Sequence, residues 1–288
     1  MPDVVDIKNV GPILKHKQSK TEFLPRLSAR ICVAGPSGVG KGVLVMQLLT
    51  NPEFYRGCFE RIYYFSQSAK VDSNLLGLKS YCEKELGQTD ECLFSEFDEA
   101  FLRELLNKQL KITQHLKQRA GNGGSKKAMG VCVVIDDFID MPSVVRKANG
   151  VLSSIAIRGR HGNVTCFYMT QKYRALGTEI RTNFNALMFF RQRSRFDLET
   201  FLEENSAIIP KEQLYQMYVK ATNRDHGFLY CDLMQSNPER MFYSSFHSRL
   251  LPVDDAEEIE PILNEDAPIT GALQRDGVGG GALSTKRA

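Results

Sequence analysis

The sequence of 288 residues, 42% of them hydrophobic, is long enough for one large α/β domain with a substantial core. Its seven cysteines include no Cys-x-x-Cys pair and no cluster with histidine at metal-ligand spacing, so we expect no zinc site and a reducing, intracellular compartment. No stretch approaches the length of a membrane span and the N-terminus lacks a signal-peptide pattern, which predicts a soluble protein.

Charge is distributed unevenly along the chain. Residues 253–288 contain eight acidic and three basic residues, so their net charge is −5. Because the whole chain carries +3, residues 1–252 carry about +8. A Gly-rich stretch at 277–281 follows the acidic part, and together they predict a disordered C-terminal tail. Residues 1–27 are polar and basic without a strong period and are predicted to form an N-terminal arm.

The first motif follows a predicted buried strand at 30–34. Glycines in the next eight residues let the loop turn its N–H groups toward an anion, and Lys41 can reach the outer phosphates of a nucleotide. The pattern matches G-x-x-x-x-G-K-[ST] except that Gly42 replaces the hydroxyl residue that normally holds magnesium. A plain Gly-rich turn between a strand and a helix is the alternative. The residues predicted to bind the nucleotide are Gly35, Pro36, Ser37, Gly38, Val39, Gly40, Lys41 and Gly42.

Two carboxylates end a second predicted strand at 130–136. The run Val-Cys-Val-Val-Ile before Asp136 and Asp137 is typical of a buried parallel strand, whose C-terminal end lies at the edge where ligands bind in open α/β sheets. Adjacent strand residues face opposite ways, so the two acids are expected to differ in role. A helix N-cap followed by a turn aspartate is the alternative.

Three more strands complete the predicted sheet, at 62–66, 164–170 and 186–190. The strand at 164–170 ends next to Gln171, which could contact a γ-phosphate or an attacking water. Helices are predicted at 72–83, 98–117, 196–204 and 211–219, and a hairpin is predicted from 227–233 and 241–246. The Gly-rich segment 120–127 is predicted to be a flexible loop.

Arginines are concentrated between residues 158 and 195, where seven of them accompany a single acid, Glu179. Such a stretch suits a surface that follows phosphates or an arginine that acts between subunits. A solvated basic face without a partner is the alternative.

The Asp136–Asp137 pair and four later segments together resemble the FtsK–HerA superfamily of DNA-pumping ATPases over about residues 28–250. These segments are 158–163, 169–174, 180–183 and 190–197. The match is closest to the poxvirus-type virion-packaging ATPases of large DNA viruses, virophages and Polinton-like elements. The resemblance implies a RecA-like P-loop fold of the additional-strand class. In this class a strand with a polar sensor lies between the phosphate-loop strand and the acidic strand of a mainly parallel sheet that helices flank. The predicted C-terminal hairpin would extend that sheet.

The resemblance also implies roles for single residues. Lys41 matches the phosphate-loop lysine, Asp136 the Mg²⁺ carboxylate, acting through water, and Asp137 the acid that polarises the attacking water. Gln171 matches the sensor, and Arg160 is the first candidate for an arginine finger, ahead of Arg181 and Arg158. Two departures from the pattern are the missing hydroxyl at Gly42 and the short side chain of Asp137, where many members of the superfamily have glutamate.

The expected function is therefore an ATPase that uses ATP and Mg²⁺ to move double-stranded DNA into a viral procapsid. The expected assembly is a homo-hexameric ring formed by an ATPase domain at 28–252, with a capsid or membrane-vertex protein as a further partner. The expected location is the virion or an intracellular virus factory. Two alternatives remain: a nucleotide-binding assembly module without motor activity, and a DNA-segregation or conjugation ATPase of the same superfamily.

Overall fold

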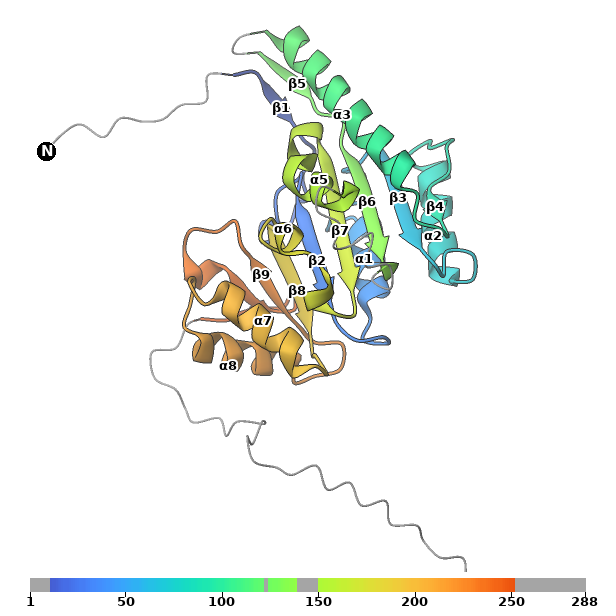
Figure 1. Cartoon of the computed structure of the whole chain (residues 1–288). Helices are drawn as coiled ribbons and strands as arrows, with labels where there is room; N and C mark the ends of the chain where they lie inside the picture. Colours follow the sequence, from blue (N-terminus) through green and yellow to red (C-terminus); the bar gives the residue numbers. More distant parts are fainter. Residues whose placement is uncertain (1–10, 122–123, 139–149, 252–288) are drawn as a thin grey trace, which may run out of the picture. The chain divides into compact units, whose positions relative to one another are not determined.

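A nine-stranded sheet forms the centre of the molecule in the computed structural model, which describes residues 11–121, 124–138 and 150–251 (Figure 1). Its strand order is β11-β10-β9-β8-β2-β7-β6-β3-β4. The strands are β2 (Arg30–Ala34), β3 (Arg61–Ser66), β4 (Leu93–Phe94), β6 (Val131–Asp136), β7 (Val164–Thr170), β8 (Ala186–Phe190), β9 (Phe228–Asp232), β10 (Phe242–Ser244) and β11 (Ser248–Arg249).

The six strands from β4 to β8 in this order are parallel, and β9, β10 and β11 continue the sheet in antiparallel pairs. Strand β7 lies between β2, which leads into the phosphate loop, and β6, which ends in the acidic pair. This inserted strand defines the additional-strand class, so the predicted fold class is confirmed. The predicted C-terminal hairpin is also confirmed, as β9 and β10 at the edge beyond β8.

Helices cover both faces of the sheet, because the buried strands alternate their side chains between two hydrophobic clusters. One face packs α3 (Glu99–Ala120), α5 (Val151–Arg158), α7 (Arg195–Asn205) and α8 (Lys211–Thr222). The other face packs α1 (Lys41–Thr50) and α2 (Ser73–Lys84). In β6, Val133 and Ile135 face the first cluster, whereas Cys132 and Val134 face the second. Asp136 therefore continues the row that faces α1.

The predicted helices start where capping residues stand in the sequence. Asp98 accepts a hydrogen bond of 2.9 Å from Phe101 N at the start of α3, and Ser194 accepts one of 3.3 Å from Asp197 N at the start of α7. Leu102, Leu105 and Leu106 form the buried stripe of α3. Two helices were not predicted, α5 and the short α6 (Thr178–Arg181), because neither has a capping side chain.

The predicted flexible loop at 120–127 is wrong for its last three residues. Strand β5 (Ser125–Lys127) pairs in parallel with β1 (Ile13–Lys15) in a separate two-stranded sheet. The sequence Ser-Lys-Lys has no apolar alternation, so its strand conformation depends on a partner more than 100 residues away in the chain.

Part of the predicted N-terminal arm packs against the domain. Leu24 and Leu27 are buried in the cluster under α1 and α2. The division of the chain at residues 28 and 253 stays a prediction, and the predicted disordered tail at 253–288 lies outside the described residues. In the described part of the chain, no helix is both long and apolar enough to cross a membrane.

Candidate active site

The predicted site residues meet at one edge of the sheet, because β2, β6 and β7 are parallel and their C-terminal ends lie side by side. Ala34 is in register with Thr170, and Asp136 is in register with Met169. The first N–H of the phosphate loop, from Gly35, donates to Thr170 O at 3.0 Å. The loop, the acidic pair and Gln171 are thus brought together from three strands.

The phosphate loop adopts the conformation that its glycines permit. Gly38 and Gly40 have φ of 82° and 99°, in the region that residues with a Cβ rarely adopt. Gly35 packs so closely on β8 that a Cβ there would lie 2.6 Å from Phe190 Cβ. Helix α1 begins directly after Gly40, without a side-chain cap and without an acidic residue in its first turn. Its first N–H groups and its dipole therefore favour an anion at this point.

Lys41 is the first residue of α1 and is 7% exposed. Its Nζ donates to Gly35 O at 2.8 Å and to Pro36 O at 3.0 Å, so the ammonium lies over the loop rather than in solvent. Burial lowers the pKa of Lys41, and the negative charges of Asp137 and Asp136 oppose this effect. The lysine and the two carboxylates are therefore close enough to interact electrostatically across the site.

Asp136 is held by the neighbouring strand β3. Tyr64 Oη donates to Asp136 Oδ2 at 3.2 Å, and Ser66 is in register with Asp136. Burial, followed by the charge of Asp137, raises the pKa of Asp136 to about 6. Hydrogen bonds from Tyr64 and Ser66 and the charge of Lys41 act in the opposite direction. The fold thus keeps a partly desolvated carboxyl group beside the phosphate loop, where a cation would favour its ionised form.

Asp137 has a different environment, as the sequence predicts. Its backbone adopts a left-handed conformation with φ of 53°, which aspartate tolerates better than most residues. Gln171 Nε2 donates to Asp137 Oδ2 at 2.7 Å, a contact that joins the ends of β6 and β7. Asp137 Oδ1 is buried and, among the described residues, has no hydrogen-bond partner. One oxygen is therefore fixed by Gln171, while the other remains able to accept a hydrogen bond from a ligand or water.

A hollow of about 360 Å³ adjoins the two carboxylates. It is lined by Ser66, Gln67, Ser68, Asp136, Asp137, Gln171 and Lys172. The buried, unpaired acceptor Asp137 Oδ1, the carboxyl group of Asp136 and the anion-binding loop fit a nucleotide with a divalent cation. Asp136 is the residue that would hold the cation, with the phosphate oxygens and water as its other ligands.

Three residues that contact the site were not predicted from the sequence. Two of them, Tyr64 and Ser66, lie within a predicted strand. The polar side chain of Ser66 at the end of that strand is the sequence feature that could have indicated its role. His226 Nδ1 lies 3.0 Å from Val39 O, so a turn that follows α8 supports the phosphate loop. No local pattern predicts a contact between residues 187 positions apart.

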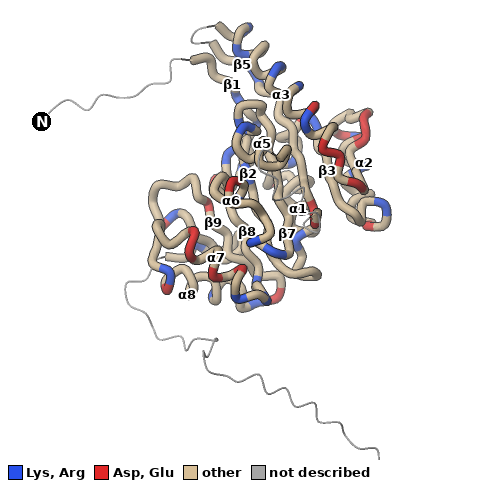
Figure 2. The backbone as a smooth tube through the Cα atoms, in the orientation of Figure 1, with Lys and Arg blue, Asp and Glu red and all other residues tan. Residues whose placement is uncertain are grey.

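The Arg-rich stretch does not form one surface. Arg158 and Arg160 precede the N-terminal end of β7, whereas Arg191 and Arg193 follow the C-terminal end of β8, at the opposite edge of the sheet (Figure 2). The seven residues of β7 separate these edges by about 20 Å. The arginines of 158–195 therefore do not share one surface, because β7 and β8 each run from one edge of the sheet to the other.

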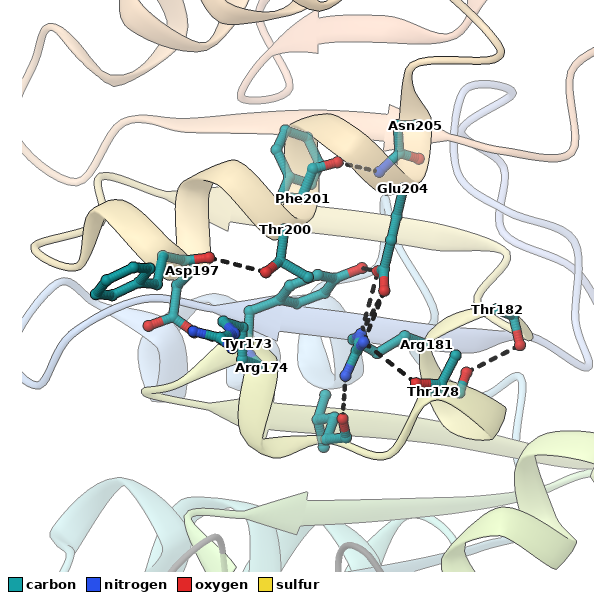
Figure 3. A network of polar contacts seen from close by, with 12 residues as sticks. Tyr173, Arg174, Thr178, Arg181, Thr182, Asp197, Thr200, Phe201, Glu204 and Asn205 are labelled. Carbon is teal, nitrogen blue, oxygen red and sulfur yellow. Dashed lines mark hydrogen bonds and ion pairs between the residues drawn. The ribbon is translucent and has the colours of Figure 1, made fainter.

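Arg181 is engaged inside its own subunit (Figure 3). Its guanidinium contacts Glu204 at 2.7 Å, donates to Leu176 O and lies over the ring of Tyr173 at 5.6 Å. Tyr173 Oη donates to the same carboxylate at 2.9 Å. This network ties α6 to α7 and occupies Arg181, which is no longer a candidate for an arginine finger. Arg160 is exposed on the 3-10 turn η2 (Gly159–Gly162), and its role stays a prediction.

We expect Gly42→Ser to lower the Mg²⁺ concentration at which ATP hydrolysis is half-maximal. A Cβ at Gly42 would meet nothing within 4 Å, so serine fits and restores the hydroxyl ligand. Gly42→Ala is the matched control, because both variants remove the helix-disfavouring glycine and only serine adds an oxygen. An unchanged Mg²⁺ dependence in Gly42→Ser, together with a shift in Ser37→Ala, would assign the hydroxyl role to Ser37.

The raised pKa of Asp136 predicts a pH-dependent stability in the presence of a metal chelator. The pKa rises from its ordinary value of 3.8 to about 6 on folding, so ionisation is less favourable in the folded protein. The contribution of Asp136 to the free energy of unfolding is therefore fully present below pH 4, and it is lost as the pH rises through 6. Asp136→Asn should therefore raise the free energy of unfolding at pH 7, by on the order of 2 kcal/mol, and much less at pH 4. Equal effects at both pH values in chemical denaturation would contradict the burial of this carboxylate.

The chain is similar to solved structures of a viral genome packaging NTPase and of ATPases, and it matches no family model and no curated protein. The genome packaging NTPase B204 of Sulfolobus turreted icosahedral virus 2, in complex with AMP, is 14% identical. That match covers 75% of this chain and 96% of B204, with a TM-score of 0.46.

Two further ATPase structures give lower TM-scores. The cytoplasmic domain of the type VII secretion ATPase EccC of Thermomonospora curvata is 15% identical over 64% of this chain and 23% of its own, with a TM-score of 0.44. EssC of Geobacillus thermodenitrificans is 14% identical over 56% and 32%, with a TM-score of 0.42. By its own strand order and phosphate loop, the chain has the fold of the P-loop NTPases of the additional-strand class.

Proposed function

We propose that the chain is an ATPase whose site is the edge formed by the phosphate loop, Asp136, Asp137 and Gln171. The observation that carries this proposal is the 2.7 Å contact between Gln171 and Asp137, with the second oxygen of Asp137 buried and unpaired beside the loop. A carboxylate fixed at one oxygen and available at the other suits a group that orients and polarises an attacking water.

Each residue then has a distinct task. The N–H groups of the loop and of α1 bind the phosphates, and Lys41 moves from the loop carbonyls to the outer phosphate oxygens. Asp136 would hold Mg²⁺ through water, and the cation would supply charge neutralisation on the phosphates. Asp137 accepts hydrogen bonds from the attacking water. Gln171 fixes the orientation of Asp137 and is proposed to contact the γ-phosphate, so that it would link the state of the nucleotide to strand β7.

We further propose that hydrolysis drives double-stranded DNA into a viral procapsid. The support is the sequence resemblance to virion-packaging ATPases together with the inserted strand β7. In this proposal the subunits form a ring, a hexamer by resemblance, in the virion or in the virus factory. A capsid or membrane-vertex protein would anchor that ring.

In the ring, Arg160 is proposed to stabilise charge on the phosphoryl group bound by a neighbouring subunit. Its exposure on η2 leaves it accessible to a second copy of the chain. Subunits with Arg160→Ala should therefore recover ATPase activity when mixed with subunits that carry Lys41→Ala. Full activity of Arg160→Ala alone would rule this residue out as the finger.

One observation favours a second function, that of a nucleotide-binding assembly module without motor activity. Gly42 removes a protein ligand of Mg²⁺, and phosphate binding tolerates this loss better than metal-dependent hydrolysis does.

ATP hydrolysis measured with and without duplex DNA separates the two functions. A motor is expected to hydrolyse ATP faster when duplex DNA is added, and Lys41→Ala should be inactive under both conditions. ATP binding that does not depend on magnesium, without hydrolysis under either condition, would favour the assembly module. Hydrolysis that duplex DNA does not change would leave an ATPase and remove the DNA motor.

A further inference from the structure

A basic surface lies at the edge of the sheet opposite the candidate active site, and the proposed function does not use it. It consists of exposed side chains on α3 from Lys108 onward, on β1 and on β5. Its members are Lys15, Lys108, Lys111, Lys117, Arg119, Lys126 and Lys127, called here the α3 basic surface. Figure 2 shows Lys and Arg positions along this part of α3, whereas acidic positions gather around α2.

Chain segments far apart in sequence build this surface. The parallel pairing of β1 with β5 sets Leu14 opposite Lys126 and Lys15 opposite Lys127, and both strands contact α3. The 3-10 turn η2 is fixed to the same helix, because Asn163 Nδ2 donates to Thr113 Oγ1 at 2.8 Å. The arrangement is therefore a defined scaffold that belongs to the domain.

The surface carries almost no compensating negative charge. The sequence contains no Asp or Glu between Glu104 and Asp136, and none from residue 11 to residue 21. Among ion pairs between described residues, Lys127 with Glu60 at 2.9 Å is the one that involves this surface. Seven like charges in one region repel each other, and this repulsion lowers the stability of the fold unless an anionic partner neutralises them.

The shape of the surface suits an extended polyanion. From Lys108 to Arg119 the helix runs about 16 Å, the length of about five phosphates along one strand of duplex DNA. Beside it lies a hollow of about 550 Å³ between α3 and η2, to which Lys117 and His161 contribute and no carboxylate does. The exposed basic side chains of α3 and this hollow without a carboxylate together favour contact with a phosphate backbone.

We propose that the α3 basic surface binds the phosphate backbone of double-stranded DNA. The proposal rests on the proposed function for the choice of DNA as the polyanion. It places the DNA at the N-terminal ends of β6 and β7, the strands whose opposite ends hold Asp136, Asp137 and Gln171. The two sites are then connected by the same two strands.

The test is the affinity for a fluorescent duplex, measured without nucleotide at several salt concentrations. The variant combines Lys117→Gln, Arg119→Gln and Lys126→Gln, three exposed residues outside the nucleotide site. The matched control removes three exposed lysines on other faces, with Lys79→Gln, Lys84→Gln and Lys220→Gln. Each lost phosphate contact should reduce the slope of log affinity against log salt by about 0.9, so the variant should lose roughly 2 to 3 in slope and at least 10-fold in affinity.

The control should bind like the wild type, and basal ATP hydrolysis should be unchanged in both. A variant with wild-type affinity and slope would overturn the proposal, as would a wild type that does not bind duplex DNA at low salt. In the latter case, binding to vesicles with anionic lipids would identify a membrane as the partner. If the wild type binds duplex DNA but does not hydrolyse ATP, the proposed ATPase is refuted, whereas the assignment of the α3 basic surface to DNA binding stands.

Discussion

Asp137→Asn is expected to bind ATP with near wild-type affinity and to hydrolyse it roughly 100-fold or more slowly. Removal of a general base typically costs a factor of this size or larger. Asparagine keeps the shape of the side chain, still accepts a hydrogen bond from Gln171 and tolerates the φ of 53° at this position. The change therefore removes the charge that polarises water and leaves the loop and Lys41 in place.

The comparison variant is Asp136→Asn, which should weaken ATP binding only where that binding depends on Mg²⁺. Affinities measured by calorimetry over a range of Mg²⁺ concentrations, together with single-turnover hydrolysis, distinguish the two variants. If Asp137→Asn loses magnesium-dependent affinity and Asp136→Asn keeps it, then the roles assigned to the two acids are exchanged.

The sequence predicts the parts of the site that local chemistry determines. A buried apolar run followed by glycines and Lys41, and a second run ending in Asp136, each need only a few neighbouring residues to be recognised. The strand ends then meet because parallel strands share an edge. The inserted position of β7 came from the resemblance, since nothing within residues 164–170 states which strands flank it.

Long-range contacts account for what the sequence did not predict. Arg160 and Arg191 lie apart because of the direction in which β7 and β8 run. The ion pair between Arg181 and Glu204 depends on the packing of α6 against α7. The pairing of β1 with β5 likewise joins polar segments that have no strand period. In each case the contact is made with a residue distant in sequence, and no pattern of neighbouring residues predicts it.

Lys41→Ala is expected to abolish hydrolysis, with a decrease of at least about 100-fold, and to weaken ATP binding. Removal of one preorganised group that stabilises the transition state costs a factor of about 100 to 1,000, and Lys41 carries a full charge toward the outer phosphates. The fold should survive. Burial lowers the pKa of Lys41, so the ammonium is a partly desolvated charge whose removal relieves a cost, and alanine favours the first turn of α1.

The hydrogen bonds from Lys41 to the carbonyls of Gly35 and Pro36 are the reason to measure stability as well as activity. If these bonds mainly hold the loop, Lys41→Ala should lower the melting temperature, and Lys41→Gln, which keeps a donor without the charge, should restore both stability and hydrolysis. If the charge acts on the nucleotide, Lys41→Gln should fold normally and remain inactive, while the matched surface variant Lys79→Ala keeps wild-type turnover. Wild-type hydrolysis by Lys41→Ala would refute the assignment of the site, because no other described lysine or arginine is held on the carbonyls of this loop.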